Sequence, residues 1–150
     1  MYSMCQHANP RLSNELKNNT MSYYFNKVLK DIGFEEAIKI VEAELKKEGF
    51  GILTEINIQE TLKKKIDVDF KKYKILGACN PHFAHKALKS EDKIGLFLPC
   101  NVVVEENEDG NVEVSIVDPI ASMSPVENKE LGGLASEVQL KLMNVINNIN

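Results

Sequence analysis

Residues 96–119 read LFLPCNVVVEENEDGNVEVSIVDP, and this stretch decides the class of fold. β-Branched residues recur at every second position on both sides of Asp109-Gly110, a dipeptide typical of a β-hairpin turn. The pattern predicts one strand over residues 96–106 and a second from Val112 up to Asp118-Pro119. Pro99 removes a ladder donor and is expected at a strand start, an edge or a bulge. Because a hairpin joins antiparallel strands, the fold is not a regular series of parallel βαβ units.

Upstream of the hairpin, two helices are predicted from spacing and end signals. Apolar residues recur 3, 4, 7 and 11 positions after Phe34, as one face of a helix requires, and Gly49 is expected to end that helix. Asn80-Pro81 supplies an N-cap and a proline at the first position of a second helix. After the hairpin, a long apolar stripe from Leu131 to Ile146 predicts a terminal helix.

Three further strands and a short helix complete the pattern. Strands are predicted near the aromatic start at residues 23–28, at 50–57 and at 73–79, with a short helix over 58–65. The terminal helix is expected to open with a capping box at Ser124-Pro125 or nearer Asn128. Gly132-Gly133 would then allow close packing or a kink. We therefore expect an α+β fold with a mixed, largely antiparallel sheet and helices packed on one face.

Composition limits both the domain count and the function classes. The chain has 150 residues, of which 43% are hydrophobic and 27% charged, which fits one domain and excludes intrinsic disorder. A net charge of −4 argues against a nucleic-acid or anionic-membrane binder. No signal peptide or membrane span is evident, so a cytoplasmic protein is expected. Residues 1–21 are predicted to be a flexible tail, with Met21 as a candidate natural start and residues 22–150 as the domain.

Three linked motifs resemble the domain-of-unknown-function family number 302. They are L-G-A-C-N-P at 76–81, A-H-K-A-L at 84–88 and L-P-C-N-V-V-V at 98–104, followed by D-P at 118–119. The resemblance implies a compact α+β domain of the TATA-binding-protein-like class in an uncharacterised, bacterial-type family. It also implies a homodimer and carries no established activity.

The first functional hypothesis is a non-catalytic small-ligand-binding or sensing module. The C-N-P and P-C-N motifs fall at element junctions on two strands that are expected to share a sheet. The amides and the helix N-terminus there can hold a small molecule. Whether the protein is an enzyme stays open, and no cofactor is predicted. The candidate ligand-binding residues are Asn80, Pro81, His85, Pro99, Asn101 and Asp118.

The alternative hypothesis is thiol chemistry. Cys79 lies just before a helix N-terminus, which would lower its pKa, while Cys100 could act as a resolving thiol and His85 as a base. Cys5 lies in the predicted tail, where nothing fixes its position or lowers its pKa. A third and weaker alternative is a zinc site, because Cys79, His82, His85 and Cys100 offer suitable donors without the usual spacing. The sequence predicts a place for a site, and it does not predict a reaction.

Overall fold

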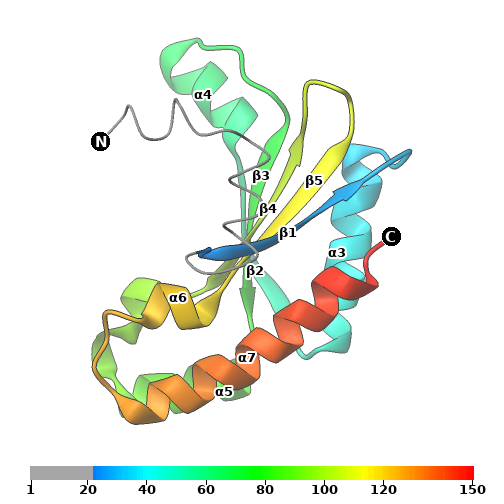
Figure 1. Cartoon of the computed structure of the whole chain (residues 1–150). Coiled ribbons are helices and arrows are strands. Elements are labelled where there is room, and N and C mark those ends of the chain that lie inside the picture. The colour runs from blue at the N-terminus through cyan, green and yellow to red at the C-terminus, as the bar shows by residue number, and fades with distance from the viewer. Residues whose placement is uncertain (1–21) are drawn as a thin grey trace.

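The computed structural model describes residues 22–150, so the predicted tail, Met21 and Cys5 lie outside the described residues. The described chain alternates strands and helices and then ends in a hairpin and two helices (Figure 1). The elements are β1 (Tyr24–Leu29), α3 (Phe34–Lys47), β2 (Gly51–Asn57), α4 (Ile58–Ile66), β3 (Tyr73–Cys79), α5 (Pro81–Ser90), the 3-10 helix η1 (Asp92–Phe97), β4 (Cys100–Glu106), β5 (Val112–Val117), α6 (Pro119–Met123) and α7 (Lys129–Asn148).

The five strands form one sheet in the order β1-β5-β4-β3-β2, and every pairing is antiparallel. The Asp109-Gly110 hairpin is confirmed: β4 pairs with β5, and Gly110 adopts a φ of 86° that favours glycine. β2 and β1 are the outer strands. A register shift between Ile52 and Thr54 interrupts the regular ladder of β2.

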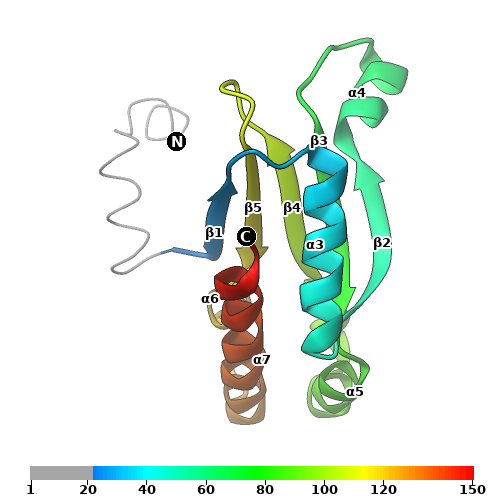
Figure 2. The same ribbon diagram turned by 90° about the vertical axis from the view of Figure 1, so that its right-hand side faces the viewer.

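Helices α3 and α7 cover one face of the sheet, as expected (Figure 2). We call the opposite face the helix-free face, because no helix among residues 22–150 covers it (Figure 1). Glu35 and Glu36 in the first turn of α3, and Lys46 and Lys47 in its last, complement the helix dipole. Gly49 follows α3 with a φ of 87°, as predicted for its C-terminal glycine. The expected α+β domain is confirmed.

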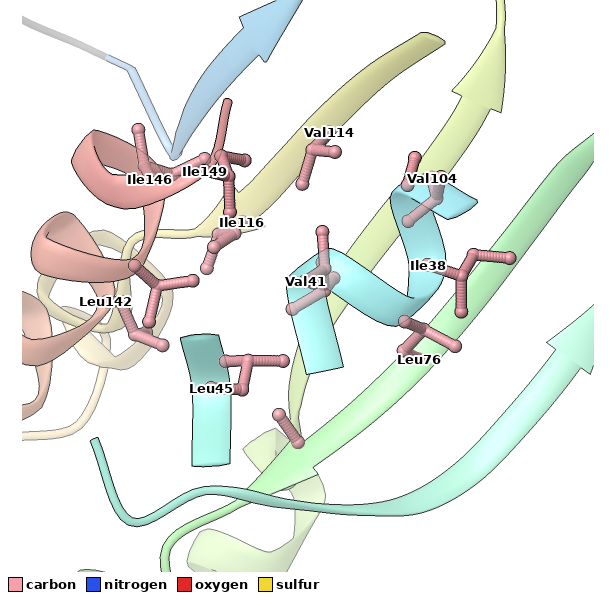
Figure 3. Close-up of a cluster of buried hydrophobic side chains, with 14 of the residues drawn as sticks. Ile38, Val41, Leu45, Leu76, Val104, Val114, Ile116, Leu142, Ile146 and Ile149 are labelled. Carbon is pink, nitrogen blue, oxygen red and sulfur yellow. The ribbon is translucent and has the colours of Figure 1, made fainter. Parts of the chain in front are cut away.

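The core lies between the sheet and these two helices. Figure 3 shows side chains from α3, α7 and the central strands meeting there. Burial of each large aliphatic side chain contributes roughly 1.5–3 kcal/mol. The residues that meet there include Ile38, Val41, Leu45, Leu76, Val104, Val114, Ile116, Leu142, Ile146 and Ile149.

The structure corrects three local expectations. Residues 92–97 form the 3-10 helix η1, so the strand predicted from Leu96 begins only at Cys100, just after Pro99. Pro119–Met123 form the unpredicted helix α6. Asn128 accepts a hydrogen bond from the Glu130 backbone N–H at 3.0 Å, so Asn128, and not the Ser124 capping box, caps the terminal helix.

Two further features bear on the expectations. A Cβ added at Gly132 or at Gly133 would meet nothing within 4 Å, so these glycines do not serve close packing. No helix among residues 22–150 combines the length and apolar character needed to cross a bilayer.

Candidate functional site

The C-N-P and P-C-N motifs meet at one end of the sheet. Cys79 is the last residue of β3, Asn80 follows as the N-cap of α5, and Cys100 is the first residue of β4. Ala78 pairs directly with Cys100, which brings the two motifs side by side. Helices α5, α6 and α7 extend beyond the sheet at this end (Figure 1).

A small cavity of about 40 Å³ lies between these strand ends and the three helices. Its walls are almost entirely apolar, and both Cys79 and Cys100 line it. Pro99 and Pro119, from the P-C-N and D-P motifs, line it as well. Other lining residues are Phe83, Ala84, Leu98, Met123, Leu131 and Ala135.

Both thiols of the cavity are free and uncharged at neutral pH. Burial raises the pKa of Cys79, and burial together with the nearby Cys79 raises the pKa of Cys100 to about 11. These directions are opposite to the depressed pKa expected for Cys79 at the start of α5. The cause at Cys79 is desolvation, which disfavours the charged thiolate. The two sulfurs therefore behave as small hydrophobic groups.

Asn80 has a structural role that its burial makes necessary. It is 8% exposed, and its side chain accepts a hydrogen bond from the Phe83 backbone N–H at 3.5 Å and donates one to the Glu48 carbonyl at 3.4 Å. Asn80 therefore caps α5 and ties its start to the end of α3. Gly49 makes room for this contact, since a Cβ there would lie 2.9 Å from Asn80 Nδ2.

Four other predicted site residues do not line the cavity. Pro81 and His85 are exposed on α5. Asn101 is exposed on the helix-free face of the sheet, because the residue after the buried Cys100 points to the opposite side. Asp118 lies next to the cavity and caps α6 through the Ile120 N–H at 3.0 Å, while Gln139 Nε2 donates to the same oxygen at 3.1 Å.

The donors of the weak zinc alternative do not come together. Cys79 and Cys100 line the cavity, whereas His82 and His85 are exposed and do not. Within residues 22–150 no group of three or more His, Cys, Asp or Glu side chains is arranged to hold a metal ion.

Sequence reasoning missed the cavity wall contributed by the long helix. Leu131, Ala135 and Val138 of α7 line the cavity, together with Met123 of α6. The apolar stripe of the terminal helix indicated that this face is buried. Its spacing did not predict which half of the helix packs on the sheet and which half packs on α5.

Two of the three comparisons with known proteins find a match, and both lead to the same family. The profile of the family described as "Domain of unknown function DUF302" matches residues 25–149. The chain belongs to the DUF302 family. A crystal structure of an uncharacterized conserved DUF302 protein from Bacillus stearothermophilus is similar, with a TM-score of 0.78 and 27% identity. The similarity covers 85% of this DUF302 chain and 98% of that chain. The comparison with curated proteins finds no match.

Proposed function

We propose that this DUF302 domain is a non-catalytic module that binds a small uncharged molecule in the cavity between the C-N-P and P-C-N motifs. The observation that carries the proposal is the cavity itself. Five elements, β3, α5, β4, α6 and α7, surround the cavity. Residues of the C-N-P, P-C-N and D-P motifs all line it, and they leave it unfilled. Packed protein interiors leave few voids larger than a water molecule.

The chemistry of the walls selects the ligand class. Among residues 22–150 no charged side chain lines the cavity, and the side chain of Asn80 is already hydrogen-bonded within the protein. An apolar ligand of a few heavy atoms fits about 40 Å³. Larger ligands need movement of a wall, and Met123 is the flexible side chain that can supply it.

The same groups argue against thiol catalysis. With a pKa of about 11, Cys100 is roughly one part in ten thousand thiolate at pH 7. His85 does not line the cavity, so no histidine of the described part of the chain lines it beside the thiols. A nucleophilic cysteine needs a lowered pKa or an adjacent base, and this site supplies neither.

The test uses xenon, an uncharged atom of suitable size, with NMR detection of methyl groups. We expect saturable shifts at the methyls of Ala87 and Leu131, which also line the cavity, under xenon pressure. The Ala84→Leu variant, which fills the cavity, should lose them. The Ala43→Leu variant, which makes the same change on the exposed side of α3, should retain them.

Xenon shifts that persist in Ala84→Leu, or that spread without saturation over the surface, would refute the proposal. Benzene, a larger apolar ligand, then tests whether the cavity walls can move to admit a ring. Thermal stabilisation by benzene in the wild type and in Ala43→Leu, but not in Ala84→Leu, is the expected result. This comparison separates ligand binding from a general effect of the apolar additive.

The homodimer implied by the family resemblance is a separate proposal. Light scattering coupled to size-exclusion chromatography should then give twice the chain mass of 16.9 kDa. A mass equal to that of one chain across the concentration range would refute the homodimer.

A further inference from the structure

The helix-free face of the sheet carries a second hollow, distinct from the apolar cavity. It is an open groove of about 360 Å³, within the range of small-molecule sites. Its floor is formed by the central strands β3, β4 and β5, and Asn101 and Ser115 add polar groups to it. Figure 2 shows that α3 and α7 lie on the other side of the sheet.

Two carboxylates face each other in the floor of this groove. Glu105 of β4 pairs directly with Glu113 of β5, and both line the groove. Like charges placed directly across a ladder destabilise a sheet. The two side chains are also half-buried: the side chain of Glu105 is only 17% exposed. The fold thus holds an unfavourable pair at a partly desolvated position.

The protein balances only part of this charge. Lys71 forms an ion pair with Glu105 at the margin of the groove. Glu113 is held by two neutral donors, Asn26 Nδ2 at 2.8 Å and Asn107 Nδ2 at 3.1 Å. Among residues 22–150, two carboxylates and one ammonium leave the groove with one net negative charge.

Tyrosine rings form the walls around these carboxylates. Tyr23 and Tyr24 stand at the β1 side in an edge-to-face pair with centroids 4.9 Å apart, and Tyr73 stands at the β3 side. Burial, together with the nearby charge of Glu105, raises the pKa of Tyr73, and Tyr23 contributes in the same direction. Tyr73 is therefore neutral at pH 7, and the electron-rich faces of the three rings attract cations.

We propose that this groove binds a small organic cation, with an ammonium group above the Glu105–Glu113 pair and its carbon substituents against the tyrosine rings. A carboxylate floor with aromatic walls suits an alkylammonium group better than a metal ion. A metal needs more oxygen ligands than these two carboxylates offer, and residues 22–150 hold no cluster of three acidic, His or Cys side chains. The site is independent of the apolar cavity.

Choline is the first probe, and 3,3-dimethylbutan-1-ol is its neutral carbon isostere. Isothermal titration of the full chain at low ionic strength should give choline a dissociation constant of about 1 mM, as expected for a ligand of this size. The isostere should bind at least about tenfold more weakly, since it lacks the charge. Equal affinity of the two probes, or no choline binding at 20-fold higher concentration, would overturn the proposal.

Variants locate the site. Glu113→Gln keeps the size of the side chain and removes the charge, so choline affinity should fall about tenfold. Glu108→Gln makes the same change at the exposed hairpin tip, outside the groove, and should leave the affinity within about twofold. Equal losses in the two variants would assign binding to the general charge of the protein and overturn the proposal.

Stability and assembly supply two further readouts. Removing the like-charge pair should raise the thermal midpoint of ligand-free Glu113→Gln. A lowered midpoint with unchanged choline affinity would give Glu113 a purely structural role and refute the proposal. Sedimentation should give the same mass with and without choline. A dimer that choline dissociates would assign the groove to a second copy of the chain instead.

Discussion

The same substitution, glycine to alanine, should have opposite effects on stability at two positions of this domain. Gly77 lies inside β3, where an added Cβ would overlap Thr54 Oγ1 and lie 2.7 Å from Pro99 Cγ. Gly133 lies in α7, where an added Cβ meets nothing within 4 Å and φ is not positive. The chemistry of the change is identical, so only the surroundings can set the sign.

The magnitudes follow from these surroundings. Gly133→Ala removes a helix-interior glycine and should stabilise the domain by about 0.5–1 kcal/mol, or about 3 °C in thermal midpoint. Gly77→Ala forces an overpacked contact and should destabilise it by about 1–3 kcal/mol. Thr54 can turn away because it is an exposed side chain, whereas Pro99, just before β4, has a rigid ring.

The assay is urea unfolding of both variants and the wild type, with the slope checked for constancy so that midpoints report stability. Thr54→Ala in the Gly77→Ala background removes one of the two overlaps and should restore part of the loss. A neutral or stabilising Gly77→Ala would refute the packing of Pro99 and Thr54 against β3. A destabilising Gly133→Ala would refute the open surroundings of α7 at that position.

Three further outcomes are expected. Asn80→Ala should cost about 1–2 kcal/mol through the lost cap of α5, whereas Asn101→Ala, on the exposed face, should stay within about 0.5 kcal/mol by urea unfolding. Burial raises the pKa of Cys100 in the folded state to about 11, so the unfolded chain loses this proton at lower pH than the folded chain. The free energy of unfolding should therefore fall by up to roughly 2–3 kcal/mol as pH rises from about 9 to 11, with no such loss below pH 8. The pH profile of Cys100→Ala should lack this decline. Asp118→Ala should cost about 1 kcal/mol, and adding Gln139→Ala should cost little more if both act through one contact, as a double-mutant cycle measures.

Local chemistry explains which elements could be predicted from the sequence. The hairpin was predictable because Asp109-Gly110 and the flanking alternation point to the same structure. The helix α6 was not, since its five residues span little more than one turn and carry no periodic pattern. Leu96 and Phe97 end η1 and adjoin the apolar stretch that leads into β4, so alternation and composition did not separate them from the strand.

The candidate site could be predicted in part. The meeting of Cys79 and Cys100 follows from the antiparallel pairing of their strands. Side chains alternate along a strand, so Asn101 points to the face opposite Cys100. The sequence contains this signal, but treating P-C-N as one motif led to Asn101 being grouped with Cys100. The protonation of the thiols could not be predicted, because it depends on burial by α5, α6 and α7. The Glu105–Glu113 pair depends on the register of the hairpin, which a turn of several residues does not fix from sequence alone.

The strand order has a consequence for the timing of synthesis. β1 is synthesised before the other strands, but its partner in the sheet is β5. Tyr24 pairs with Val117, which is synthesised 93 residues later. At about 5–20 residues per second, a translating ribosome leaves β1 without its partner for roughly 5–20 s. Leu29, fully packed in the finished core, stays uncovered during that interval. In the cell, the first strand to be synthesised is therefore one of the last to pair in the sheet.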